Sequence, residues 1–218
     1  MSSISIITTA LLLLSFQAQE SDPPMPYEEK AGEILSEAGK LIQQLDALHL
    51  TFAYTAEDAP QSIDDETDGY LYSSGDKYYM KVGQNHFISD GQTAWSYLED
   101  VNEVHISPAE DTQQALTPTS ILSDFRDDFR VKWIREESHN GRDTHVIDLT
   151  PEEPHAFYKY RVGIDMERKR LVYTIAYDRD GGEYRYEVLT YNTDPEIPEG
   201  TFSFDPEEHP DIEVVDLR

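Results

Sequence analysis

Residues that could do chemistry are scattered along this chain in spacings that match no known catalytic centre. The seven histidines form neither an HxxxH nor an HExxH pair, which are the patterns of common zinc sites. The chain has no GxSxG turn for a serine nucleophile, and it contains no cysteine. We therefore expect no catalytic residues, no metal site and no cofactor.

Acidic residues are abundant: 44 Asp and Glu against 17 Lys and Arg give a formal net charge of −27. Residues 64–69 resemble the start of a calcium loop, but Gly75 stands at the twelfth position, where a bidentate Glu is required. No pair of carboxylates is singled out for glycoside hydrolysis, so a carboxylate-dependent hydrolase is an alternative without a defined site.

The sign of the charge argues strongly against a nucleic-acid binder and against an anionic-membrane binder, because either would need a basic patch. We interpret the acidity as a solvated surface suited to high salt, where screening weakens self-repulsion. The alternative is a polyanionic face for a basic partner or for Ca²⁺.

The densest cluster of aromatic side chains lies in residues 68–106, where short β-type segments alternate with the turns SSGD, SDG and LEDVN. This pattern predicts closely spaced antiparallel strands that carry Tyr, Phe and Trp. Such strands would form a surface for holding an apolar ligand.

The N-terminus has the features of an export signal. Residues 4–16 are apolar but too short to span a membrane, so we expect residues 1–19 to be a signal peptide. A Pro-rich linker at 20–26 then leads into one domain over 27–218. Without cysteine the exported protein has no disulfide and no lipid anchor of its own.

The domain begins with an amphipathic helix from Glu28, because apolar residues from Ala31 to Leu45 recur at helical spacing. The period changes to two at residues 48–54, which predicts the first strand. After an acidic loop at 57–68 and the aromatic strands, further strands are expected at 131–137, 143–149, 157–165, 170–178 and 183–191, with a tail near 202 and 212–215. The fold is therefore mainly β, with about ten or more antiparallel strands.

Residues 117–129 interrupt the strands. Thr117 is suited to cap a helix, Pro118 to begin it, and the apolar residues that follow share one face. The two predicted helices either complete a packed core or cover an apolar cavity as a lid, and the pattern alone favours neither.

Ordered segments across the mature chain resemble the LolA family of periplasmic lipoprotein carriers. They are LHLTF (48–52), DGYLY (68–72), DKYYMKV (76–82), FISDGQTAWSY (87–97), TPTSIL (117–122), DLTPEEP (148–154), IDMERKRLVYTIAYDRDG (164–181) and FSFDPEEHPDIEVVDLR (202–218). The resemblance implies an unclosed antiparallel β-barrel of about 11 strands, with a helical lid over a hydrophobic cavity.

The resemblance also implies a function and partners. We expect a monomeric periplasmic carrier that takes triacylated lipoproteins from an inner-membrane ABC exporter and delivers them to an outer-membrane acceptor. Sensor proteins of the cell envelope share the half-barrel, so a regulatory domain that senses lipids or lipoproteins is the main alternative.

Residues in the matching segments are expected to contact the acyl chains. The cavity would be lined by Leu50, Phe52, Tyr54, Tyr78, Met80, Phe87, Trp95 and Tyr97, and the lid by Ile121, Leu122 and Phe125. One departure concerns the latch: the family carries an arginine in the turn after the DGYLY-like strand, whereas this turn reads SSGD. The resemblance thus predicts a lid without its latch.

Overall fold

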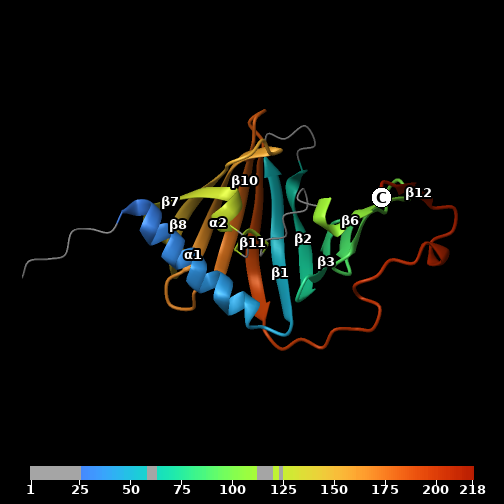
Figure 1. The fold of residues 1–218 in the computed structure, drawn as a ribbon, viewed down its shortest axis with the longest axis horizontal. Coiled ribbons are helices and arrows are strands. Elements are labelled where there is room, and N and C mark those ends of the chain that lie inside the picture. The colour runs from blue at the N-terminus through green and yellow to red at the C-terminus, as the bar shows by residue number, and fades with distance from the viewer. Residues whose placement is uncertain (1–25, 58–62, 112–119, 123–124) are drawn as a thin grey trace, which may run out of the picture.

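The computed structural model describes residues 26–57, 63–111, 120–122 and 125–218 (Figure 1). Its strands are β1 (Leu48–Glu57), β2 (Ile63–Ser74), β3 (Lys77–Val82), β4 (Asn85–Ser89), β5 (Thr93–Leu98), β6 (Glu103–Pro108), β7 (Phe129–His139), β8 (Arg142–Pro151), β9 (Phe157–Asp165), β10 (Leu171–Asp178), β11 (Glu183–Asn192) and β12 (Glu213–Asp216). Its helices are α1 (Tyr27–Gln43), α2 (Phe125–Asp128) and the single-turn 3-10 helices η1 (Ala109–Asp111), η2 (Ser120–Leu122) and η3 (Pro206–Glu208).

All twelve strands form one unclosed sheet in the order β12-β6-β5-β4-β3-β2-β1-β11-β10-β9-β8-β7. Neighbouring strands are antiparallel except for β12, which pairs with β6 in parallel. The predicted half-barrel is confirmed, with twelve strands in place of about eleven. Strand β12 overlaps the predicted tail at 212–215, but its parallel pairing was not expected, because a local pattern does not tell which strand it lies beside.

Helix α1 agrees with the predicted amphipathic helix. It starts directly after Pro26, which cannot continue a helix backwards, and runs obliquely across the strands of the β7–β11 half (Figure 1). Its apolar stripe, which includes Ile34 and Leu35, is buried. No helix in the described part of the chain is both long and apolar enough to cross a membrane. The predicted signal peptide lies outside the described residues.

Two sequence predictions need correction. The continuous helix expected from Thr117 is replaced, within the described residues, by η2 and the short α2, because Phe129 already belongs to β7. The acidic loop expected at 57–68 is also partly wrong. Residues 63–68 extend β2, where they pair with the end of β1.

The main core lies between α1, η2, α2 and the inner face of the sheet. A second, smaller core lies on the opposite face of β5 and β6, where Phe204 and Ile212 pack against Tyr97 and Val104. The C-terminal segment reaches this face by running from β11 past the ends of β1–β3 to the β6 edge (Figure 1).

Candidate functional site

Strand register decides which side chains face α1. Leu50 lies opposite Leu71, which lies opposite Met80, which in turn lies opposite Phe87. Directly opposed residues of antiparallel strands point to the same face. This row therefore lies on the inner face of four adjacent strands, and three of its members are 0–2% exposed.

Phe52 lies in the next row, opposite Gly69. A Cβ atom on Gly69 would stand 2.3 Å from the Phe52 ring, so only glycine leaves room for that ring to lie flat against β2. The Tyr186 ring meets Phe52 edge-on, with a centroid distance of 5.4 Å. Aromatic packing thus continues from β1 onto β11.

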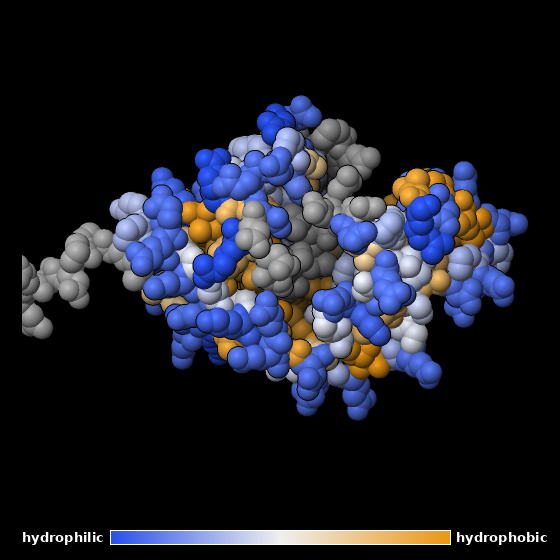
Figure 2. Space-filling view, viewed as in Figure 1, coloured by the Kyte–Doolittle hydropathy of each residue, from blue (hydrophilic) through white to orange (hydrophobic). Residues whose placement is uncertain are grey.

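One end of the inner face opens into a hollow that we call the mouth pocket. Its volume is about 590 Å³, and it lies between the end of β1, the β3–β4 turn and the start of β11. Away from this pocket, Figure 2 shows apolar surface between the C-terminal part of α1 and the neighbouring strands, with hydrophilic side chains around it. The lining residues are Tyr54, Thr67, Val82, Gly83, Gln84, Asn85, Phe87, Asp100, Tyr184 and Tyr186.

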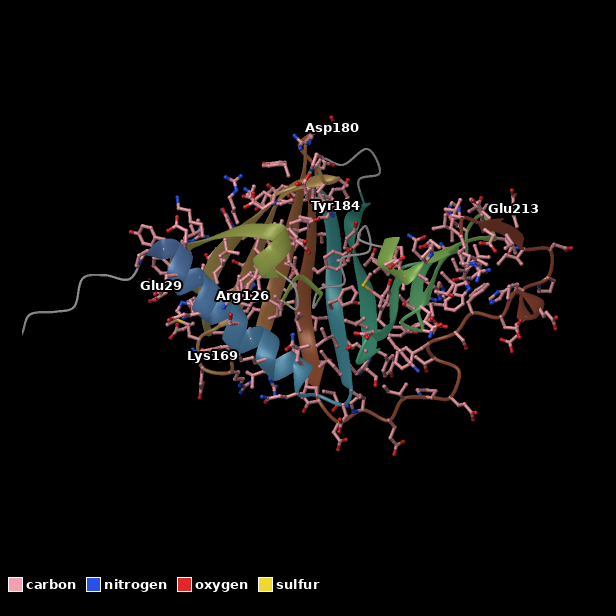
Figure 3. All side chains as sticks on the ribbon, viewed as in Figure 1. Glu29, Arg126, Lys169, Asp180, Tyr184 and Glu213 are labelled. Atoms are coloured by element: carbon pink, nitrogen blue, oxygen red, sulfur yellow. The ribbon has the colours of Figure 1, made fainter. Side chains whose placement is uncertain are left out.

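Tyrosines give the mouth pocket its chemistry. Tyr54 and Tyr186 pack with a centroid distance of 4.9 Å, and burial raises the pKa of both phenols. Both are therefore neutral at physiological pH. Tyr184, near the Asp180 turn (Figure 3), donates its hydroxyl to Asp178 Oδ2 at 3.0 Å. The pocket presents ring faces and neutral hydroxyls beside two side-chain amides and one carboxylate. Its aromatic part suits the apolar chains of a ligand, and its polar part suits the polar end of the same ligand.

A buried hydroxyl lies on the same face behind this pocket. Thr174 of β10 pairs with Tyr186 and with Val162, and its side chain is 7% exposed. Its Oγ1 atom has no hydrogen-bond partner within the described part of the chain. Such a group carries a desolvation cost that a ligand donor or acceptor would relieve.

The lid residues pack against α1. Ile121, Leu122 and Phe125 are 1–5% exposed, and all three belong to the main core. Their tightest approach is at Gly39, where a Cβ atom would stand 2.4 Å from the backbone oxygen of Leu122. Glycine at this position therefore lets η2 touch the backbone of α1.

The predicted cavity residues divide into two groups. Leu50, Phe52 and Met80 are fully buried in the main core, and Tyr54, Tyr78 and Phe87 pack against it while partly exposed; of these six, Tyr54 and Phe87 line the mouth pocket. Whether they contact acyl chains stays a prediction.

Trp95 and Tyr97 do not belong with them, contrary to expectation. Because Phe87 pairs with Ser96, both aromatic neighbours of Ser96 point to the opposite face. There they pack against the C-terminal segment in the second core. The prediction that Trp95 and Tyr97 line the cavity is therefore wrong.

Sequence reasoning missed Tyr184 and Tyr186, although a signal was present. They alternate with charged residues in β11, and Val188 continues the same period of two. That alternation marks one face of β11 as apolar, but it does not tell which other strand the face lies beside. The pairing of β11 with β1 supplies this information.

Across the described ranges, no group of three or more His, Asp or Glu side chains is placed to hold a metal ion. The segment that resembled the start of a calcium loop lies in β2. In the turn without the latch arginine, the hydroxyl of Ser74 donates to the backbone oxygen of Asp46 at 2.8 Å. This bond ties the β2–β3 hairpin to the connection between α1 and β1.

Known proteins resemble this chain in both sequence and fold. A family model described as "-like: Uncharacterized protein" matches residues 75–194, more than half of the chain. The outer-membrane lipoprotein carrier protein of Neisseria meningitidis serogroup B is 28% identical over 137 residues, which are 62% of this chain and 63% of that protein. The match thus spans less than two thirds of this curated relative.

Two solved structures are similar. An uncharacterized conserved protein from Thermus thermophilus has a TM-score of 0.58 at 15% identity, covering 86% of this chain and 99% of its own. A LolA superfamily protein from Nitrosomonas europaea has a TM-score of 0.43 at 15% identity, covering 80% and 97%. The Thermus likeness shows a shared fold.

Proposed function

We propose that this chain, which belongs to the family of that model and is a LolA-like protein, is a periplasmic carrier that shelters the acyl chains of lipoproteins. Its cargo would be triacylated lipoproteins, received from an inner-membrane ABC exporter and delivered to an outer-membrane acceptor. The residues that shelter the chains would be those of the mouth pocket and of the inner face beneath the lid.

The physical need for such a carrier is large. Each methylene group removed from water is stabilised by about 0.8 kcal/mol, so three acyl chains cannot cross an aqueous compartment exposed. A container must offer apolar contact without specific polar bonds, because the cargo also has to leave. Ring faces and neutral phenols meet both conditions.

The mouth pocket is the observation that carries the proposal. It is lined by Tyr54, Phe87 and Tyr186, and it opens at the end of an apolar core that α1 and the lid residues cover. A pocket of about 590 Å³ holds only part of a triacylated group. We therefore infer that η2 and α2 move away from the inner face when cargo enters.

Native mass spectrometry of the protein purified from the periplasm tests the cargo. We expect a co-purifying triacylated peptide. A lipid without peptide would contradict the lipoprotein assignment and favour a lipid sensor, and a protein with nothing bound would contradict the carrier proposal.

Phe87→Glu tests the site. A carboxylate at the mouth pocket would lose hydration when acyl chains enter, so we expect cargo to be lost while circular dichroism stays unchanged. Tyr158→Glu is the matched control, because it makes the same kind of change at an aromatic residue that is 43% exposed and outside the mouth pocket. Equal cargo in the two variants would exclude Phe87 from the site.

A further inference from the structure

A second, smaller pocket lies at the opposite end of β11 from the mouth pocket. Its volume is about 150 Å³, and three arginines from two turns line it: Arg142 at the start of β8, and Arg168 and Arg170 around the β9–β10 turn. Lys169 of that turn lies far from the Asp180 turn (Figure 3). The other lining residues are Asp165, Leu171, Val172, Val188, Leu189, Thr190 and Tyr191.

These arginines are unusual because no acidic side chain in the part of the chain that the structure describes pairs with them. The chain carries 44 acidic residues, yet none of the three arginines has a carboxylate within 4.0 Å among the described residues. The acid of the pocket, Asp165, has Oδ1 occupied by the backbone N–H groups of residues 167 and 168. These two bonds hold the turn in shape, while Oδ2 of Asp165 forms no ion pair with the three arginines.

The setting of the arginines favours one kind of ligand. Arg170 lies over the ring of Tyr191, with 4.6 Å between the guanidinium carbon and the ring centroid, so its position is fixed. Guanidinium forks match oxyanions in a bidentate manner, and several forks around one small pocket match a tetrahedral oxyanion best. At 0.15 M salt the screening length is about 8 Å, so exposed acidic residues farther away than this act weakly on the pocket.

We propose that Arg142, Arg168 and Arg170 form a binding site for a phosphate group. The group would come either from a soluble phosphate compound or from the headgroup of an anionic phospholipid. The site is separate from the mouth pocket, so the proposal does not depend on the carrier function.

Calorimetry of the full chain with inorganic phosphate in 0.15 M NaCl tests the first source. Co-sedimentation with phosphatidylglycerol vesicles, compared with phosphatidylcholine vesicles, tests the second. Arg142→Gln removes one fork without touching the Tyr191 contact, and we expect it to weaken binding about tenfold or more. Arg179→Gln, in the exposed turn at the other end of β10, is the control of equal charge and should bind like the parent.

Saturable phosphate binding that Arg142→Gln weakens and Arg179→Gln does not would support a soluble ligand. Vesicle binding with the same dependence, competed by phosphate, would support a lipid headgroup. The proposal is overturned if neither probe binds, or if the two variants bind alike. Thermal melts of both variants establish that they are folded, and Arg170→Gln provides a second test at the same pocket.

Discussion

The contact between Gly39 and η2 gives a prediction with an internal control. A Cβ atom at residue 39 would lie 2.4 Å from the Leu122 oxygen, whereas real Cβ contacts essentially never fall below 3.0 Å. The two backbones must therefore separate by at least 0.6 Å, the difference between these values. Gly32, in the same helix, has no atom within 4 Å of its added Cβ.

Two opposing free-energy terms decide which of the two variants is the more stable. Replacing glycine by alanine inside a helix stabilises it by about 1 kcal/mol, and this gain is shared by both sites. Overpacking a tight contact costs about 1–3 kcal/mol. Gly32→Ala should thus raise the free energy of unfolding by about 1 kcal/mol, whereas Gly39→Ala should lie about 1–3 kcal/mol below it.

Urea denaturation of the two variants and the parent measures this difference directly. A fluorescent fatty acid adds a second readout, because a displaced η2 would expose the inner face and increase uptake in Gly39→Ala alone. If the two variants were equally stable and took up equal amounts of fatty acid, the lid contact described above would be refuted.

Three further predictions concern charge. Burial lowers the pKa of His86 and of His145 below the ordinary 6.5, so as the pH falls the unfolded chain binds protons before the folded chain does. The melting temperature should therefore fall as the pH drops from about 7 to about 5.5. The fall should be smaller in His145→Gln, which lacks one of these two groups. A melting temperature that falls equally in that variant would contradict this role for His145. Asp148→Asn removes a charged acceptor that Arg161 holds at 2.6 and 2.9 Å, and should lower the free energy of unfolding in urea by about 1–3 kcal/mol; an unchanged value would show that the pair is merely incidental. Raising NaCl from about 0.05 to about 1 M should raise the melting temperature, because screening weakens the repulsion within a chain of charge −27, and a flat or falling curve would argue against it.

Local sequence patterns predicted most of the helices, strands and turns of the fold. The apolar stripe of α1 and the alternating residues of β1 and β11 lie on the faces that their periods indicate. Asn140 and Gly141 both adopt positive φ in the β7–β8 hairpin, as their sequence predicts.

The site was harder to predict, because both faces of the β2–β6 half carry aromatic rings. Tyr78 and Phe87 point to the inner face, whereas Tyr79 and Tyr97 point to the other. A shift of one residue exchanges the two faces, and only the pairing across each hairpin fixes it. The face covered by Phe204 could not be found from local patterns, since that contact spans about half of the chain.

The two edges of the open sheet differ in how they avoid pairing with another molecule. On one side the edge strand β12 is only four residues long, and it covers β6 with the chain's own C-terminal segment. On the other side β7 is eleven residues long, but Arg130, Lys132 and Arg135 interrupt its apolar positions. Short length and embedded charge both discourage edge-to-edge aggregation. An incomplete barrel can therefore keep an opening without becoming a template for fibrils.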